Sequence, residues 1–202
     1  LTLDWIGQGL AANIAERQLW TLDKGGHRIH ERFERGTTVW TLEAETSYVY
    51  SSMCHLDQTI QAPGKPEEAV TENAYDCAGN LESVWDPMHP RASLPAQPSS
   101  VYTYDALDRL TAVAQPWGGA GGGIATTSYA YDVQDHLVEV IDGNGTVTSY
   151  EYSDRDLMTG QTSEVSGAAT YTYNEHGESI GETDGRGVST VRTVDAADRV
   201  TL

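Results

Sequence analysis

The chain has 202 residues, of which 39% are hydrophobic and 21% charged, and its formal net charge is −18 at pH 7. This composition excludes an intrinsically disordered chain, and no apolar run approaches the roughly 20 residues that a bilayer-spanning helix needs. Only two residues are lysine, Lys24 and Lys65, so binding to nucleic acid or to anionic membranes is not expected. The chain begins at Leu1 and ends at Leu202 in mid-pattern, which predicts a piece of a longer polypeptide.

Residues 1–47 carry weak patterns. The segments LDWIGQGL from Leu3 and LDKGGHRI from Leu22 place an aspartate after an aliphatic residue, and we predict that both are eroded copies of the repeat described below. Ala11–Leu19 fits a short helix as an alternative, and Gly36–Glu45 alternates as a strand does.

The basic residues of Arg28–Arg35 are interrupted by Glu31 and Glu34, which favours a solvated face over a binding patch.

The chain has two cysteines, Cys54 and Cys77, which lie too far apart in the sequence for a zinc ribbon. A disulfide between them and a pair of buried thiols remain alternatives.

Tyrosines recur along the chain in a fixed register. The pairs of the form Tyr-x-Tyr are Tyr48/Tyr50, Tyr102/Tyr104, Tyr129/Tyr131, Tyr150/Tyr152 and Tyr171/Tyr173. Positions 131, 152, 173 and 194 are 21 residues apart, with Val194 in place of the last tyrosine, and Tyr75 continues the register upstream. All eleven tyrosines lie on it, which indicates tandem repeats.

Each repeat contains two predicted turns. The first follows the tyrosines, and its instances are Asp76–Gly79, Asp105–Asp108, Asp132–Asp135 and Asn174–Gly177. A short Asp or Asn side chain at the first position accepts hydrogen bonds from the turn's own amides, as is typical of a type I turn. In the second turn, Asp142–Gly145 or Asp184–Gly187, the Asp-Gly and Asn-Gly steps supply the positive φ angles of a tight hairpin turn. Two turns leave two strands of roughly five to seven residues, so each repeat is a predicted β-hairpin.

A solitary hairpin buries too little apolar surface to offset the backbone entropy of ordering it. Tyr150 and Tyr152 share one face of their strand, and in-phase tyrosines are expected to form aromatic ladders between successive units. On the second strand Leu137 and Val140 fall on opposite faces unless a β-bulge intervenes.

Three intervals between second tyrosines are longer than 21 residues. The additional residues lie in Ala62–Glu68, Asp86–Pro98 and Gln115–Gly123, all at the same phase of the repeat. We therefore expect loops along a single rim of the sheet, either as tolerated insertions or as a surface that contacts a partner.

No residue set points to catalysis or to a cofactor. Gly118–Gly123 lacks the Lys-Ser/Thr of a phosphate loop, and only His27 and His30 of the six histidines lie close together. Carboxylate pairs such as Asp105 and Asp108 recur from unit to unit, whereas a catalytic pair is normally unique. We assign no catalytic, cofactor-binding or metal-ligating residue and predict a protein that is not an enzyme.

The tyrosine-aspartate register resembles the RHS (rearrangement hotspot) or YD (tyrosine-aspartate) repeat, whose signature is Tyr-x-Tyr-Asp, two residues, Gly, Arg, Leu. The residues that carry the resemblance are Tyr104, Asp105, Arg109 and Leu110, then Tyr131, Asp132 and Leu137, and Tyr75, Asp76, Gly79 and Leu81. Aspartate replaces the glycine at Asp108, Asp135, Asp156 and Asp198. The resemblance covers 48–202, and 1–47 are predicted to be degenerate repeats.

The resemblance implies an all-β fold in which tandem antiparallel hairpins form a curved strip of a hollow β-shell. Bacterial shells of this family commonly enclose a C-terminal toxin, and similar animal shells serve adhesion. The Asp-Pro-x-Gly self-cleavage motif of the toxin class is not matched by Asp86-Pro87-Met88-His89.

We therefore expect a secreted or cell-surface structural segment whose partners are the remainder of the shell and an encapsulated toxin domain. The alternative is an extracellular adhesin or fibre subunit that binds glycans or itself through an aromatic-rich β-surface. Neither function requires a cofactor, nucleic acid or a membrane span.

Overall fold

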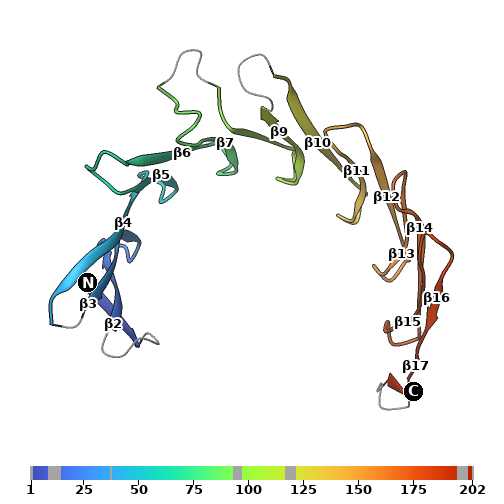
Figure 1. Cartoon of the computed structure of the whole chain (residues 1–202). Helices are drawn as coiled ribbons and strands as arrows, with labels where there is room; N and C mark the ends of the chain where they lie inside the picture. The colour runs from blue at the N-terminus through green and yellow to red at the C-terminus, as the bar shows by residue number, and fades with distance from the viewer. Residues whose placement is uncertain are drawn as a thin grey trace. The chain divides into compact units, whose positions relative to one another are not determined.

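The protein is described by a computed structural model over residues 2–8, 15–36, 38–92, 97–116, 122–194 and 200–201. Within these residues every regular element is a β-strand, and no helix suited to crossing a membrane is found (Figure 1). The chain divides into two compact units, Leu1–Val101 and Tyr102–Leu202. The all-β prediction is confirmed.

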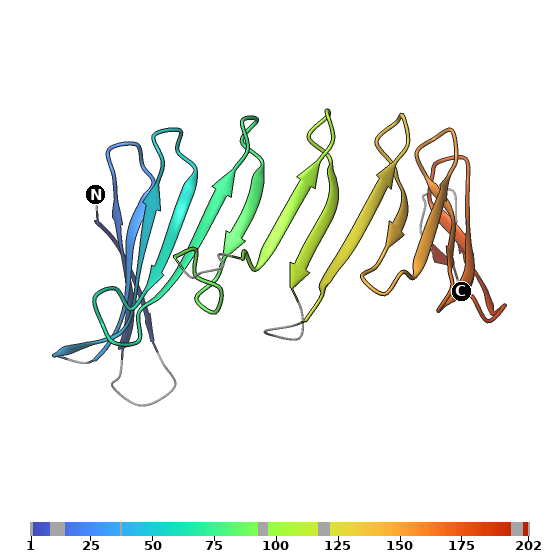
Figure 2. The same cartoon turned by 90° about the horizontal axis from the view of Figure 1, so that it is seen from above.

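The first unit is an antiparallel meander in which each strand pairs with the strands before and after it in sequence (Figure 2). Its strands are β1 (Thr2–Gln8), β2 (Ala15–Leu22), β3 (Arg28–Gly36), β4 (Trp40–Tyr50), β5 (Leu56–Gln61), β6 (Ala69–Tyr75) and β7 (Leu81–Trp85). The next strand, β8 (Ser100–Tyr104), pairs with β7 through its first two residues.

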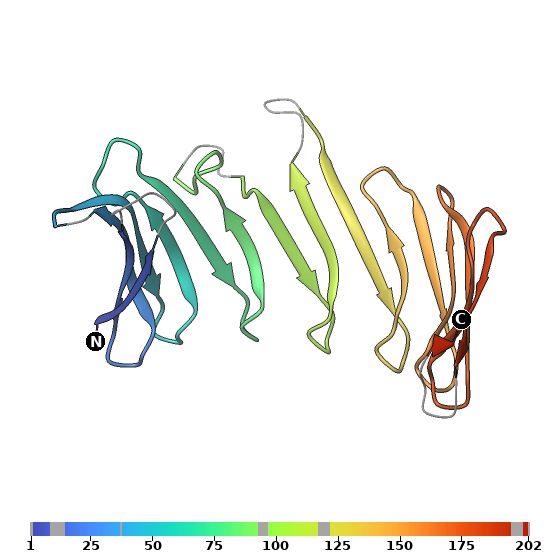
Figure 3. The ribbon, with the colours of Figure 1, turned by 60° about the horizontal axis from the view of Figure 1, so that its bottom comes forward.

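The second unit repeats this arrangement (Figure 3). Its strands are β9 (Leu110–Pro116), β10 (Ile124–Tyr131), β11 (Leu137–Ile141), β12 (Val147–Tyr152), β13 (Met158–Ser163), β14 (Gly167–Tyr173), β15 (Ser179–Thr183) and β16 (Ser189–Val191). A separate two-stranded sheet pairs β17 (Thr193–Val194) with β18 (Val200–Thr201). The predicted string of hairpins is thus observed, with two strands to each repeat.

The N-terminal expectations are corrected in three places. Ala15–Leu19 belong to β2, which pairs with β1 and β3 along its length, so the helix alternative is wrong for them, and residues 11–14 lie outside the described ones. Pairing on both sides overrides the helical propensity of a segment too short to be helical alone. Asp4 lies inside β1 opposite Leu19, so Leu3 does not precede a turn. Gly36 ends β3, and the following strand begins only at Trp40.

Every turn that follows the tyrosine position has one geometry. In Asp105–Arg109, the Asp105 amide donates to the Arg109 carbonyl at 3.0 Å, and Asp105 Oδ1 accepts from the amides of Leu107 and Arg109. The fourth residue has a positive φ in Gly26, Cys54, Gly79, Asp108, Asp135, Asp156 and Gly177. Aspartate therefore replaces glycine here without changing the turn, as expected from its tolerance of the left-handed region.

The segment after Leu22 follows the same rule. Its Asp23 amide donates to the His27 carbonyl at 2.9 Å, and Asp23 Oδ1 accepts from the amides of Gly25 and His27. An aliphatic residue thus occupies the tyrosine position of a complete turn, as the sequence indicated.

The second type of turn has the same hydrogen-bonding geometry as the first. The Asp142 amide donates to the Thr146 carbonyl at 3.0 Å, and Gly145 has φ +85°. Gly143 has no positive φ, so each such turn needs one left-handed residue, and the predicted positive φ at the Asp-Gly step is wrong.

In six hairpins a β-bulge stands at the start of the second strand. Ala130 pairs with Glu139 and Tyr131 with Leu137, so Val138 has no partner. The pairing register shifts in the same way at the tyrosine position of five other hairpins, namely β2–β3, β4–β5, β6–β7, β12–β13 and β14–β15. The bulge resolves the spacing of Leu137 and Val140, because the additional residue returns both to one face.

The two sheets have no hydrophobic core among the described residues. The buried residues there are Glu34, Ser83, Ser100 and Gly160, and none of them has an apolar side chain. A single layer has two solvent-accessible faces, so its stability depends on contacts made along the sheet from one hairpin to the next.

The arginines of Arg28–Arg35 keep 43–51% of their side-chain surface exposed, as the predicted solvated face requires, and they also form ion pairs within β3 and with neighbouring strands. Arg17 Nη2 lies 2.6 Å from the carboxylate of Glu34, which is only 5% exposed, and Arg32 lies 3.4 Å from the same carboxylate. Glu45 on β4 lies 3.6 Å from Arg32. The carboxylates of neighbouring strands explain this clustering of arginines.

Both cysteines are free and exposed, so the buried-thiol alternative is wrong and no disulfide joins them. The physical reason is their location in hairpin turns, Cys54 in the turn after Tyr50 and Cys77 in the turn after Tyr75.

Cys54 has φ +65°, a conformation that suits glycine better than a residue with a side chain. We expect Cys54→Gly to raise the free energy of unfolding in urea by about 0.5–1 kcal/mol. Ser52→Gly, in the same turn but without a positive φ, serves as the control and should not stabilise the chain. Equal effects of the two substitutions would contradict the assignment of strain to Cys54.

Candidate functional site

One hydrogen bond recurs between successive hairpins in both units. The second tyrosine of a hairpin donates its hydroxyl to the carbonyl of the first residue in the second strand of the preceding hairpin. The bonds are Tyr75 to Leu56 (3.0 Å), Tyr131 to Leu110 (2.9 Å), Tyr152 to Leu137 (3.1 Å) and Tyr173 to Met158 (2.7 Å). The register of tyrosines in the sequence is therefore a register of inter-hairpin bonds.

The tyrosine rings contact the last residue of the preceding turn. The His136 ring stacks on Tyr152 with centroids 4.4 Å apart, the His55 and Tyr75 centroids are 4.6 Å apart, and the Arg109 guanidinium lies 4.9 Å from the Tyr131 centroid. At Tyr75, Tyr131 and Tyr152 the ring partner is therefore a histidine or an arginine and not the tyrosine expected for a tyrosine-on-tyrosine ladder. The final side chain of the turn packs on the tyrosine of the next hairpin.

Arg109 joins two neighbouring turns in the second unit. Its guanidinium donates to Asp105 in its own turn at 2.8 Å, and to the Asp132 carbonyl and the Asp135 carboxylate of the next turn at 3.0 and 2.7 Å. The bond from the Arg109 side chain lowers the pKa of Asp105, and the Asp105 carboxylate raises the pKa of Arg109. This arginine of the repeat signature therefore fixes the spacing between two hairpins.

Other turns use different side chains for the same purpose. The two ring nitrogens of His136 lie 2.9 Å from Asp132 and 3.2 Å from Asp156 of the next turn. Arg155 donates to the Glu175 carbonyl at 2.8 Å. Turn-to-turn contacts thus run beside the tyrosine bonds at one rim of the second unit.

We predict that removing a single tyrosine hydroxyl lowers the stability of the sheet. Burial raises the pKa of Tyr152, which keeps its hydroxyl protonated as the donor to Leu137. Tyr152→Phe should lower the free energy of unfolding by about 1 kcal/mol, as measured in urea. Tyr150→Phe, on the same strand and face, is the matched control because its hydroxyl bonds to none of the described residues. A loss as large for Tyr150→Phe would contradict the role of the bond.

We predict that Arg109→Gln lowers the melting temperature by about 3–5 °C, since it removes both contacts to the next turn. Arg186→Gln is the control because Arg186 is bonded to Asp184 within its own turn and is otherwise exposed. An equal decrease in melting temperature for both variants would show that the contact between turns does not contribute to stability.

The turn aspartates also link stability to pH. Hydrogen bonds from the turn amides, led by Asn80 for Asp76 and by Thr146 for Asp142, lower the pKa of both carboxyls. A lowered pKa in the folded state gives stability that is complete above the unfolded-state value, about 3.9, and is lost as the pH falls through the folded-state value.

We therefore expect the melting temperature to hold above about pH 5 and to fall below about pH 4. The double variant Asp76→Asn, Asp142→Asn should have a shallower fall, because an asparagine amide accepts the same bonds without titrating, as Asn174 Oδ1 does from the amides of His176 and Glu178. If the melting temperature of this variant falls below pH 4 as steeply as that of the unsubstituted protein, the prediction is contradicted.

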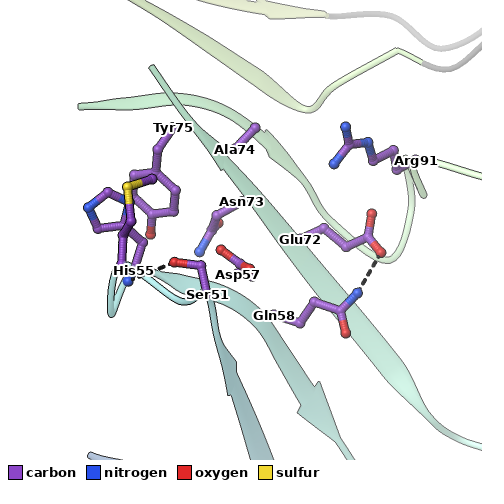
Figure 4. A pocket seen from close by; sticks show the side chains of 10 residues that line it. Ser51, His55, Asp57, Gln58, Glu72, Asn73, Ala74, Tyr75 and Arg91 are labelled. Carbon is purple, nitrogen blue, oxygen red and sulfur yellow. Dashed lines mark hydrogen bonds between the residues drawn. The ribbon is translucent and has the colours of Figure 1, made fainter. Parts of the chain in front are cut away.

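The first unit contains an open hollow of about 340 Å³ between β5, β6 and the segment after β7 (Figure 4). Its polar walls include Asp57, Glu72, Asn73 and Arg91. Asp57 is the unpaired residue of the β4–β5 bulge, so the bulge places its carboxylate at the hollow. The sequence analysis missed this site because its residues belong to different strands and to an insertion.

The longer loops of the first unit lie at one rim, as predicted. The β5–β6 and β7–β8 connections are alternate links of an antiparallel meander, and they extend from the same end of the strands (Figure 2). In the second unit, residues 117–121 of the third loop, with most of Gly118–Gly123, lie outside the described residues.

Comparison with known proteins gives a family match and a likeness in fold. Residues 131–168 match the RHS Repeat family model, whereas no curated protein matches the sequence significantly. The crystal structure of TcdB2-TccC3-TEV is similar with a TM-score of 0.50 and 13% identity, over 92% of this chain and 14% of that one. A Photorhabdus luminescens Tc holotoxin pore with a mutated TccC3 has a TM-score of 0.47, 13% identity and the same coverage.

The chain thus spans about 14% of the length of these solved chains, and at 13% identity the likeness to the first shows the fold alone. The matched segment contains Tyr131, Tyr150 and Tyr152 of the tyrosine register and the turns Asp132–Asp135 and Asp142–Gly145. The chain therefore contains an RHS repeat at residues 131–168, and its resemblance to the RHS or YD repeat family is confirmed.

Proposed function

We propose that the chain is a wall segment of a hollow β-shell that encloses a partner domain, such as a toxin domain, for secretion or delivery. Its residues 48–202 supply the RHS repeats and residues 1–47 degenerate copies of them. The RHS repeat and the shared fold support a structural role of the shell type. The remainder of the shell and the enclosed domain are the proposed partners.

The recurring bond from a tyrosine to the preceding hairpin is the observation that carries this proposal. Four hairpins are bonded to the one before them through the same atoms, so the sheet can extend without a core under it. A single layer with two open faces suits a wall. A compact enzyme instead needs an enclosed site that excludes water, and we propose that the chain is not an enzyme.

The acidic composition and the family resemblance support a secreted or cell-surface location. A function as an adhesin or fibre subunit remains the alternative, because apolar side chains at the tips of turns are exposed. Among them, Leu107 is 68% exposed and Val133 is 96% exposed.

The natural polypeptide that contains this chain tests the proposal. Images of the purified product should show closed hollow particles, and a protease should spare the enclosed domain until the particle is opened. Arg109→Gln in the same product should hasten digestion, while the control Arg186→Gln should not. Extended polymers would favour a fibre, and a mature product no larger than this chain would contradict the proposal because it could not enclose a domain.

A further inference from the structure

The hollow of the first unit has an acidic side and a basic side that do not neutralise each other. The Asp57 carboxylate makes no hydrogen bond or ion pair with the described residues, and neither does the Arg91 guanidinium, which lies 4.7 Å from the centroid of Trp85. Figure 4 shows Arg91 beside Glu72 at one end of the hollow, with the rings of His55 and Tyr75 at the other. Opposite charges are thus held within one hollow without contacting each other.

The neighbouring polar groups are hydrogen-bonded to one another. The Asn73 amide and the Tyr75 hydroxyl both donate to the Leu56 carbonyl, at 2.8 and 3.0 Å, and the Gln58 amide donates to Glu72 at 2.9 Å. The carboxylates of Asp57 and Glu72 are the anionic acceptors of the hollow, and they suit a ligand group with several N–H donors.

The guanidinium of Arg91 presents the complementary chemistry. Its planar array of N–H donors suits a carboxylate, and its stacking on the Trp85 ring holds that plane in place. Met53 and Ala74 add apolar groups to the lining of the hollow.

We propose that this hollow binds a small zwitterion, a free α-amino acid with an apolar side chain. Its ammonium group contacts the carboxylates of Asp57 and Glu72, its carboxylate contacts Arg91, and its side chain lies against Met53 and Tyr75. A volume of about 340 Å³ is at the small end of ligand sites and suits a ligand of this size.

Other ligand classes fit less well. An anion would meet two carboxylates, and a simple cation would leave Arg91 without a partner. An apolar molecule would desolvate the carboxylates without replacing their hydrogen bonds. A neutral sugar would satisfy the acceptors without using the separation of charge, so it is the rival class in the test.

The test is a titration of the 202-residue chain followed by amide chemical shifts, with L-leucine, N-acetyl-L-leucine, L-leucinamide and maltose as probes. Leucine should shift the amides of β5 and β6 with a Kd of about 0.1–10 mM. The acetylated probe lacks the ammonium group and leucinamide lacks the carboxylate, so each should bind about tenfold more weakly.

Variants identify the groups responsible. Arg91→Gln should abolish the preference for leucine over leucinamide, and Asp57→Asn should reduce the preference for leucine over N-acetyl-leucine. Glu151→Gln, a carboxylate of the second unit, should change neither preference.

Equal binding of the three leucine probes, stronger binding of maltose, or shifts outside the hollow would overturn the proposal. The absence of a saturable shift up to about 50 mM leucine would do so too.

Discussion

The structure depends on a tyrosine hydroxyl that reaches back to the carbonyl of the preceding hairpin. Tyr75, Tyr131, Tyr152 and Tyr173 make this bond in the same way, so the position of the tyrosine relative to the preceding hairpin is a physical requirement of the sheet. A unit of another length accommodates its additional residues in a loop, because the tyrosine must still meet the same carbonyl. The longer loops of the first unit are therefore confined to one rim.

The described residues form a sheet without a hydrophobic core, so its energetics resemble those of a repeat protein. The described hairpins contribute turns capped by Asp, Asn or Ser, bulges that direct the second strand and, at His55, Arg109 and His136, a side chain over the ring of the next tyrosine. Arg109 combines several of these contacts and shows why arginine suits the signature position. Such contacts between adjacent hairpins allow a sheet to extend while both of its faces stay accessible to solvent.

The wall and the proposed ligand hollow use different parts of the repeat. The wall uses the tyrosine and the turn, which recur from unit to unit. The hollow uses the bulge residue Asp57 and the insertion residue Arg91, which are free to differ from unit to unit. Binding chemistry can thus be added at the bulges and loops of one hairpin pair without disturbing its bonds to neighbours.

The sequence by itself determined the hairpin repeat, its turns and the register of the tyrosines, because period-two alternation, Asp-initiated turns and in-phase aromatics are local and repeated features. Only the tertiary structure decided the rest. It gave Tyr152 a histidine partner in place of a tyrosine, placed Cys54 and Cys77 at exposed turns, and paired Arg17 with a buried Glu34. These outcomes depend on which residues of different strands face one another. The odd separation of Leu137 and Val140 was compatible with a β-bulge, but the sequence did not locate the bulges that set this register.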